Sequence, residues 1–197
     1  MVRNDFSFRG AGIVADSKFA LLAATRSRRR KGNAKATPCQ IRNAIIAPTT
    51  LVPKGIQSYW RADFFNEISD EAVELHLKHG SNLPTPFSTM HIYPIDGAVH
   101  RVAQGDTAFN FRNANFAQVI VGFSPEASDA DRLRSWTVDY WDALHSYSAG
   151  GAYINFMMDE GLDRIQATYG DNYNRLVQVK RRYDPNNVFH VNQNIKP

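Results

Sequence analysis

The pattern of apolar and polar positions along this chain changes its period several times, and each change falls at turn-forming residues. A helix is predicted from Ser69 to Gly80, because a capping serine and two acidic residues open it and a glycine closes it. Residues 87–93 interleave polar and apolar side chains, as a strand does, and lead to the Asp96-Gly97 turn. Residues 98–103 are predicted to form a second strand that pairs with the first through this turn.

A third strand is predicted over residues 116–123, where Val119, Ile120 and Val121 form a continuous apolar run. Such a run is typical of a strand that is covered on both faces. Ser128 and Asp131 resemble a capping box, so the next helix is expected to begin there. This helix carries one apolar stripe that we expect to pack against the sheet, made of Leu133, Trp136, Tyr140 and Leu144.

The last part of the chain predicts a short strand at residues 152–156 and then two helices. Gly170 ends the first helix, and Asp171 is expected to cap the second and to pair with Arg175. Asp184-Pro185 stops the second helix. One face of that helix is made of Tyr173, Leu176, Val177, Lys180 and Tyr183. The fold class is therefore α+β, an antiparallel β-sheet covered by helices and followed by a C-terminal helical segment.

Charge separates the first 50 residues from the rest. Residues 1–50 hold 10 lysines and arginines against 2 acidic residues, whereas residues 51–197 hold 13 against 17. The basic run between Arg26 and Lys35 is open to two interpretations, a localisation signal or phosphate-binding arm, and a solvated extension that buries nothing. We favour the extension, disordered or outside the fold, because its charges repel one another. Nucleic acid is therefore not an expected partner.

Composition excludes several classes of protein. No run of 18 apolar residues predicts a membrane span, and no secretory signal precedes the fold, so a cytoplasmic location is the default expectation. The single cysteine, Cys39, permits neither an internal disulfide nor a cysteine-based metal cluster. His76 and His79 are too few for a zinc site, so no metal is expected and both are predicted to face solvent. No dinucleotide fingerprint, P-loop or nucleophile elbow is present.

The specific residues of the C-terminal sequence are more informative than their apolar periodicity. Residues 148–156 read SAGGAYINF, and residues 168–195 read TYGDNYNRLVQVKRRYDPNNVFHVNQNI. Together they resemble the C-terminal signature of the berberine bridge enzyme-like, FAD-linked oxidases. Residues 107–112, TAFNFR, resemble the family's Thr-Ala-Phe-x-His-Arg, with Phe111 where histidine is usual and Arg112 retained. The resemblance begins at about Leu51.

This resemblance implies that residues 51–150 are part of a substrate domain and that residues 151–197 are the berberine-bridge-type C-terminal segment. The family's pyrophosphate-binding flavin domain precedes both, and its motifs do not occur in this sequence. The implied chemistry is oxidation of an alcohol or C–H group of a small-molecule substrate by FAD, commonly with O2 as acceptor. The chain is thus expected to be the distal part of a longer oxidase, with a missing N-terminal flavin domain as its partner, and to be inactive and colourless alone.

The resemblance also supplies candidate site residues. Tyr153 and Asn155 match the family's Tyr-x-Asn motif beside the flavin, where an asparagine amide can donate and accept. Phe156 stands where many relatives have a tyrosine, and it is expected to be a wall of the substrate pocket. Arg112 either binds an acidic substrate or pairs with a carboxylate, and we favour the pair.

The catalytic base is not assigned by the sequence. His91 and Tyr93 share a strand face and are candidates for proton transfer. A plainer interpretation makes Tyr153 an ordinary strand residue and Asn155 a turn former. Two functions stay open. The chain is either the substrate- and flavin-facing part of an oxidase, or a non-catalytic binding or regulatory protein that cannot hold FAD alone.

Overall fold

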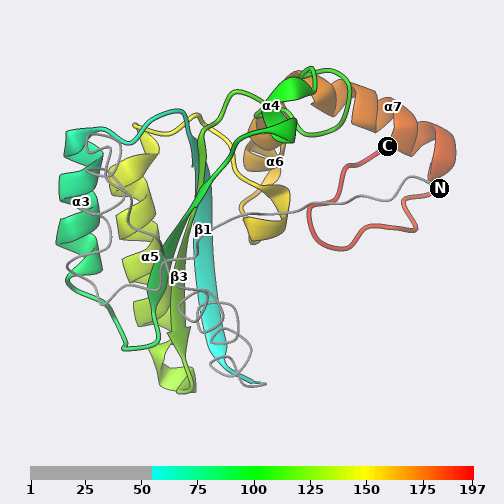
Figure 1. Ribbon diagram of the computed structural model, residues 1–197. Helices are drawn as coiled ribbons and strands as arrows, with labels where there is room; N and C mark the ends of the chain where they lie inside the picture. The colour runs from blue at the N-terminus through cyan, green and yellow to red at the C-terminus, as the bar shows by residue number, and fades with distance from the viewer. Residues whose placement is uncertain (1–54) are drawn as a thin grey trace, which may run out of the picture.

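The computed structural model describes residues 55–197, which form a three-stranded antiparallel sheet with helices on both faces (Figure 1). The strand order is β1-β3-β2, with β3 (Phe116–Ser124) in the centre, β1 (Gln57–Phe65) on one side and β2 (Thr89–Pro94) on the other. The continuous apolar run of β3 explains its central place, because a central strand is covered on both faces. The predicted α+β fold class is confirmed.

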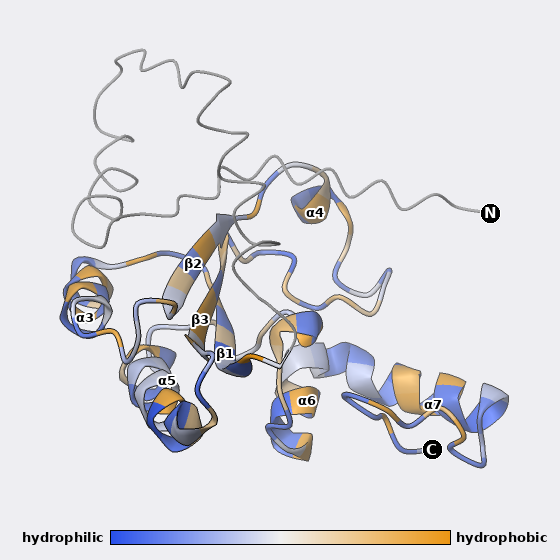
Figure 2. Ribbon diagram, turned by 90° about the horizontal axis from the view of Figure 1, so that it is seen from below, coloured by the Kyte–Doolittle hydropathy of each residue, from blue (hydrophilic) through white to orange (hydrophobic). Residues whose placement is uncertain are grey.

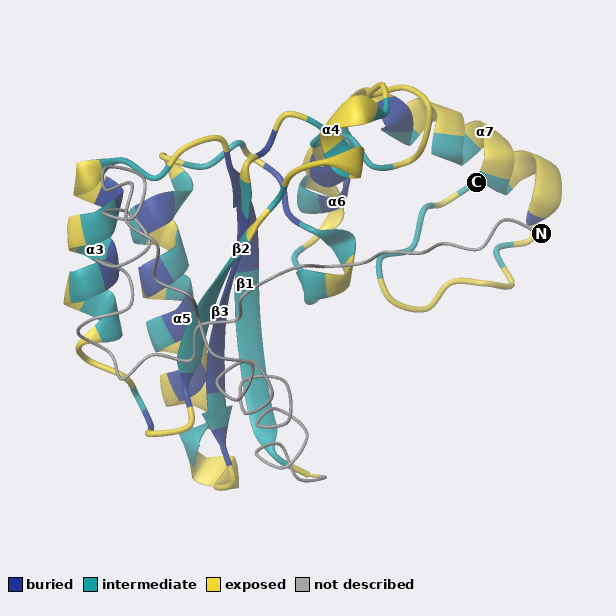
Figure 3. Ribbon diagram, viewed as in Figure 1, coloured by how far each residue is buried: buried dark blue, intermediate teal, exposed yellow. Residues whose placement is uncertain are grey.

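One face of the sheet is covered by α3 (Asp70–Gly80) and α5 (Ala130–His145), which lie side by side against it (Figure 3). The apolar stripe predicted for the longer helix is confirmed as the packing surface. The buried core of this helix-covered face consists of Phe65, Ala72, Ile120, Tyr140 and Leu144, with Leu133 equally buried in α5. The helix predicted from Ser69 is also confirmed, because the Ser69 hydroxyl accepts a hydrogen bond from the Ala72 amide at 3.2 Å.

The opposite face of the sheet, called the second face below, is lined by the alternate residues of the same strands. The strand register places Phe64, Ala117 and Tyr93 in one row across the sheet. Ala62, Val119 and His91 form the next row. Two short elements cover part of this face, a 3₁₀ turn η2 (Ile154–Phe156) and helix α6 (Leu162–Tyr169), whose Ile165 is buried against Val119 and Val121. Figures 1 and 2 show α6 on the side of the sheet away from α3 and α5.

The chain continues through the 3₁₀ turn η3 (Gly170–Asn172) into α7 (Tyr173–Tyr183), which lies at the periphery and buries no residue (Figure 2). The predicted end of α7 before Asp184-Pro185 is confirmed. The Asp184 carboxylate accepts from the amides of Val188 at 2.7 Å and Phe189 at 3.0 Å, and also from Lys180. The hydrogen bond from Lys180 is the main cause of the lowered pKa of Asp184. This cluster turns the chain back along α7 towards its end at Pro197 (Figure 1).

The strand predicted at residues 98–103 is wrong, because the chain there forms a single helical turn, α4 (Ala98–Arg101). β2 pairs with β3 instead of with the segment that follows it. Gly97 has φ 65° and ψ −120°, which directs the chain out of the sheet rather than into a two-residue hairpin. His100 then contacts the Ala114 carbonyl through Nε2 at 2.9 Å, and this bond fixes the turn to the start of β3.

Two predicted helix caps and one ion pair are also wrong. α5 starts at Ala130 without a side-chain cap, because a 3₁₀ turn, η1 (Ala127–Asp129), precedes it, so Ser128 and Asp131 form no capping box. α7 likewise starts at Tyr173 after η3, so Asp171 does not cap it. Arg175 donates to the Gly105 carbonyl at 3.1 Å and makes no ion pair with Asp171 among the described residues. In both cases a 3₁₀ turn adds one turn of chain that the sequence pattern did not reveal.

His76 was expected to face solvent, and this is wrong, because it is buried between α3 and α5 with 3% of its surface exposed. Its Nδ1 lies 2.8 Å from the hydroxyl of Tyr140. Burial lowers the pKa of His76 to about 4, with a smaller contribution from His79. The imidazole is therefore neutral at pH 7 and belongs to the core. His79 stacks on the Tyr140 ring at 4.9 Å, and it is half-buried.

Candidate functional site

The segment that carries the signature Tyr-x-Asn is not the strand that was predicted. Its chain runs beside β1 only as far as Gly151, through the hydrogen bonds Ala149 N to Phe64 O and Phe64 N to Gly151 O, both 2.7 Å. The Ala152 amide then donates to the Thr168 hydroxyl on α6 at 3.3 Å, and residues 154–156 turn as η2. The side chain of Thr168 thus replaces the next backbone partner and ends the pairing with β1.

Gly151 is required by a close approach at this point. A Cβ atom built on it would lie 2.2 Å from two ring atoms of Phe111, which is far inside contact distance. Phe111 in turn stacks on Phe64 at a centroid distance of 4.9 Å. The aromatic ring at position 111 therefore fills the space between β1 and the glycine, and it fixes where the chain leaves the sheet edge.

Tyr153 and Asn155 still point to the same side, although the backbone between them is a turn. The Asn155 amide Nδ2 donates to the Tyr153 hydroxyl at 2.9 Å. Asn155 is exposed, whereas Tyr153 is half-buried beside Phe64 and Ala117. The predicted strand is wrong, but the hydrogen bond between the two side chains brings them together on one side of the turn.

η2 brings this pair to the rings of β2 and so forms an aromatic–polar cluster. Phe156 contacts Tyr153 edge to face at 5.1 Å and Tyr93 at 5.8 Å. His91 lies nearly parallel to Tyr93, with ring centroids 5.9 Å apart. Their shared strand face is thereby confirmed. Five of the six residues singled out in the sequence thus meet at one place on the second face, called the β2–η2 cluster below: His91, Tyr93, Tyr153, Asn155 and Phe156.

The two titratable side chains that β2 brings to the β2–η2 cluster are both uncharged at neutral pH. Burial lowers the pKa of His91, which therefore presents a neutral imidazole. Burial also raises the pKa of Tyr93, so its hydroxyl keeps its proton. The cluster consequently offers a proton acceptor and a proton donor in an apolar setting, next to an amide that can both donate and accept.

Arg112 does not join this cluster. Its Nη1 donates to the Val99 carbonyl at 3.2 Å, its Nη2 donates to the Thr107 hydroxyl, and its guanidinium lies 4.9 Å from the centre of the Phe109 ring. Arg112 makes no ion pair within residues 55–197, so the expected pair with a carboxylate is wrong there; the loop carbonyl and hydroxyl take its two terminal nitrogens. Arg112 closes the loop between α4 and β3.

A pocket of about 390 Å³ lies on the other side of η2, and Asn155 lines it as well. Its remaining walls come from η2 and the residue after it, β1, α6 and the C-terminal tail: Trp60, Ile154, Met157, Tyr169, Val191, Asn192 and Gln193. The Gln193 amide donates to the carbonyls of Met157 at 2.8 Å and Met158 at 3.1 Å, which fixes the tail over the pocket. No charged side chain lines it, so its chemistry suits a neutral polar group.

Sequence reasoning missed the contribution of β1 and of the tail to this pocket. A signal for Trp60 was available, since the four aromatic residues between Gln57 and Phe65 favour a strand, but no element was assigned there. Asn192 and Gln193 belong to the closing Asn-Gln-Asn-Ile of the signature, although their place over η2 depends on the turn at Asp184.

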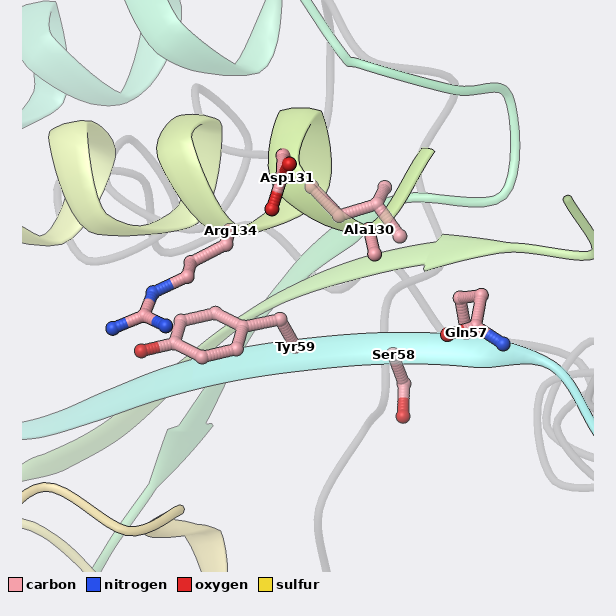
Figure 4. Close-up of a pocket in the computed structure, with 7 residues that line it drawn as sticks. Gln57, Ser58, Tyr59, Ala130, Asp131 and Arg134 are labelled. Carbon is pink, nitrogen blue, oxygen red and sulfur yellow. The ribbon is translucent and has the colours of Figure 1, made fainter. Parts of the chain in front are cut away.

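A smaller hollow of about 200 Å³ lies between β1 and the first turns of α5 (Figure 4). Arg134 packs over the ring of Tyr59 at 5.5 Å there, and Asp131 brings a carboxylate beside it. Figure 4 shows Ser58 pointing to the opposite side of the strand. The hollow holds none of the residues that the sequence singled out, and its guanidinium is stacked on Tyr59.

Within residues 55–197 no three metal-ligating side chains come together in a way that would hold an ion. None of the helices in that range combines the length and the apolar character that a bilayer crossing needs. The candidate chemistry on the described part of the chain is therefore that of the β2–η2 cluster and its adjoining pocket.

Comparison with known proteins places this arrangement in a family. Residues 152–196 match the family model described as "Berberine and berberine like". The chain is 30% identical over 148 residues to an FAD-linked oxidoreductase of Dictyostelium discoideum, covering 74% of this chain and 32% of that protein. It is 31% identical over 157 residues to the FAD-linked oxidoreductase sorD of Penicillium rubens, covering 71% and 31%. The chain therefore spans about a third of the length of these relatives.

Solved structures agree on the fold. The wild-type BBE-like 1 protein of Physcomitrella patens superposes with a TM-score of 0.63 at 23% identity, covering 82% of this chain and 33% of that one. A glycopeptide hexose oxidase complexed with teicoplanin superposes with a TM-score of 0.66 at 20% identity, covering 73% and 33%. Residues 152–196 form a berberine-like region, the chain is a partial match to FAD-linked oxidoreductases, and its fold is that of the BBE-like structures.

The relatives are FAD-linked, and the donor set of the cluster fits one end of that cofactor. The isoalloxazine of FAD is a flat apolar ring system with a polar edge. The rings of Phe156, Tyr153 and Tyr93 offer apolar surface, and the exposed Asn155 offers an amide at its border. Among residues 55–197 no hydrogen bond occupies the Asn155 Oδ1, so this oxygen can accept from a ligand. The described residues include no glycine-rich turn opening a helix that would hold the pyrophosphate.

Proposed function

We propose that this chain supplies the substrate-facing and flavin-facing wall of an FAD-dependent oxidoreductase that oxidises an alcohol or C–H group of a small molecule. One observation carries the proposal. The hydrogen-bonded pair Tyr153–Asn155 stands at the border of an uncharged aromatic cluster, on the one face of the sheet that is only partly covered. Bound FAD would supply the two-electron chemistry, accepting a hydride from the substrate.

The residues of the chain have separate parts in this proposal. Asn155 binds the polar edge of the isoalloxazine, with its amide already oriented by Tyr153 at 2.9 Å. Phe156 has no ionisable group, and its ring contacts to Tyr93 and Tyr153 make it a wall that orients substrate and excludes water. His91 and Tyr93 are the groups that can move a proton, because burial keeps the imidazole neutral and the phenol protonated.

The partner that completes the site is proposed to be a flavin domain that covers the C-terminal tail. Four apolar side chains of the signature region are largely exposed in the chain by itself: Tyr183 at 72%, Val188 at 66%, Phe189 at 79% and Val191 at 78%. Exposed apolar residues gathered on one segment mark an interaction surface. Nucleic acid is not proposed as a partner, because residues 51–197 as a whole hold 13 lysines and arginines against 17 acidic residues. O2 is proposed as the electron acceptor on the family resemblance.

A second function is favoured by Phe156 itself. Phenylalanine cannot exchange a proton, so a cluster with Phe156 can bind a flat aromatic ligand without converting it to a product. In that case the chain is a binding or regulatory protein that keeps the pocket of the family without its catalysis. The distinction is whether hydride transfer occurs once a flavin is held in place.

The test joins this chain to the part of the Dictyostelium relative that lies outside the match. Flavin content is measured after desalting, and the rate of anaerobic flavin reduction is measured with a panel of aldoses and primary alcohols. Asn155→Ala is expected to lower flavin retention about tenfold or more, because a hydrogen bond in a dry site is lost. The matched control is Asn82→Ala, an exposed asparagine in the loop after α3, away from the second face and the tail. Equal retention and equal reduction in both variants would show that the proposed site is misplaced.

A further inference from the structure

A network of buried charges joins β1 to the segment that carries Tyr153 and Asn155. Arg164, on α6, donates through Nη2 to the Asp63 carboxylate at 2.5 Å and to the Ala62 carbonyl at 2.7 Å. Its Nη1 donates to the Gly150 carbonyl at 3.0 Å, and its Nε donates to Glu160 at 3.2 Å. The guanidinium of Arg164 is thus bonded to β1 and to both Gly150 and Glu160.

The network has equal numbers of opposite charges and little contact with water. Glu160 also pairs with Arg61 at 2.5 Å, so two arginines meet two carboxylates whose side chains are 0% and 1% exposed. His145, at the end of α5, contacts the second oxygen of Asp63 at 2.8 Å. The Trp141 ring lies against both guanidinium groups, at 5.3 Å from Arg61 and 5.1 Å from Arg164.

The positions that Arg164 holds are informative. Gly150 precedes Tyr153 by three residues, and Glu160 follows Asn155 by five, so the network fixes both ends of the segment 150–160. Between these ends the segment has only two turn hydrogen bonds of its own, Phe156 N to Tyr153 O and Met157 N to Ile154 O. The middle of the segment is also held, by the Ala152 bond to Thr168 and the Gln193 bonds to Met157 and Met158. Among the described residues, Arg164 is the side chain that bonds to both of its ends.

A buried ion network is a poor source of net stability, because the cost of removing charges from water offsets much of their attraction. The aromatic and aliphatic core of the helix-covered face stabilises the fold without such a cost. What the network adds is geometry, since the planar fork of an arginine fixes several acceptors in one plane.

We propose that Arg164, with Glu160 and Asp63, is a positioning residue that holds the Tyr153–Asn155 pair in its place on the second face. The role in catalysis rests on the proposed function, whereas the positioning itself concerns this chain alone. Arg164→Lys keeps the charge but loses the fork. It is expected to free the segment 150–160 and to leave the rest of the sheet in place.

The experiment uses the full chain labelled with ¹⁵N. The first readout is the side-chain amide signal of Asn155, with Tyr153→Phe as the reference for a lost hydrogen bond. The second readout is hydrogen exchange at the amides of Phe156 and Met157, compared with the amides of β3. In Arg164→Lys the Asn155 signal should move towards its position in Tyr153→Phe, and exchange at the two amides should accelerate on the order of tenfold, with β3 unchanged. The control is Arg132→Lys, whose exposed arginine pairs with Asp129 at 2.7 Å, and it should change neither readout.

An unchanged Asn155 signal in folded Arg164→Lys would overturn the proposal. If that variant does not fold, Glu160→Gln replaces it, with the same expected result and the same contradiction. Exchange that accelerates equally in β3, or loss of folding in both variants, would assign the network to the stability of the whole domain and would also overturn the proposal. No flavin is present in these measurements, so a negative result here is distinct from a failure of Asn155→Ala to weaken flavin binding.

Discussion

The two faces of the sheet are built in different ways. The helix-covered face buries large apolar side chains completely, with Ile120 of β3 and Leu133 and Tyr140 of α5 at 0% exposure. Its two helices have 11 and 16 residues. The second face is covered by a 3₁₀ turn, an eight-residue helix and a tail, and its rings at Tyr93, Tyr153 and Phe156 are only half-buried.

The difference shows which face is complete in this chain. A core of close-packed aliphatic and aromatic groups needs no further partner, so the helix-covered face is a structural platform. The second face leaves rings, an amide and a pocket within reach of a ligand, and an ion network holds its covering segment. Substitutions on the second face are therefore expected to change function, and substitutions on the helix-covered face are expected to change stability.

The largest expected effect is a loss of stability caused by a substitution in the core of the helix-covered face. Leu144→Ala removes a side chain that is 1% exposed, and it should lower the free energy of unfolding by about 2–5 kcal/mol through lost burial and the cavity left behind. The control is Val179→Ala on α7, which is 47% exposed and should cost less than about 1 kcal/mol. Urea unfolding followed by circular dichroism measures both. Equal losses would mean that α7 is as much a part of the core as α5.

The next effect concerns pH. The pKa of His76 is about 4 in the folded chain, below the value of 6.5 for a free histidine, so the unfolded chain binds the extra proton first. The stability contributed by neutral His76 is present above pH 6.5 and is lost as the pH falls to about 4, by about 3 kcal/mol in total.

His76→Asn keeps a hydrogen-bonding group for Tyr140 but cannot titrate. Unfolding measured between pH 4 and pH 7 should therefore show a flatter profile in this variant, whereas the exposed His190→Asn should keep the parental slope. An unaltered slope in His76→Asn would show that other groups account for the acid sensitivity.

A smaller structural effect is expected from Phe156→Tyr. The half-buried ring should accept a hydroxyl with a change in unfolding free energy of less than about 1 kcal/mol. In the protein joined to a flavin domain, the added phenol lies beside Tyr93 and Tyr153 and should change the pH profile of flavin reduction. Phe156→Leu is the control, and it should alter substrate affinity alone. A pH profile that Phe156→Tyr leaves as it was would assign proton transfer to His91 or Tyr93.

The sequence predicted the helix-covered face well because local signals and packing agree there. The Ser69 cap, the stripe of α5 and the apolar run of β3 each reflect a period that burial enforces. It predicted the second face poorly at the level of backbone, since residues 98–103 and 152–156 have β-prone composition but no strand partner. Whether a short segment becomes a strand depends on an available edge, and that information lies elsewhere in the chain.

The candidate site could be predicted as a set of residues but not as a geometry. The signature motifs identified Tyr153, Asn155 and Phe156, and strand alternation joined His91 to Tyr93. The carboxylate partner predicted for Arg112 was wrong, because its actual partners, a carbonyl and a hydroxyl of one loop, cannot be recognised from residue spacing. The domain limits proposed near residue 50 and residue 150 stay predictions, and the expectations for residues 1–50 lie outside the described part of the chain.

The central claim is that the border of the β2–η2 cluster binds an isoalloxazine. Its most direct test is a titration of the ¹⁵N-labelled chain with FMN, a soluble flavin that needs no pyrophosphate site, followed by nuclear magnetic resonance. Weak binding is expected, with shifts at Tyr93, Tyr153 and the Asn155 side-chain amide, no shifts on α3 or α5, and loss of the response in Asn155→Ala. The claim would be contradicted by shifts that centre on the hollow between Tyr59 and Arg134, or by a response that Asn155→Ala leaves intact.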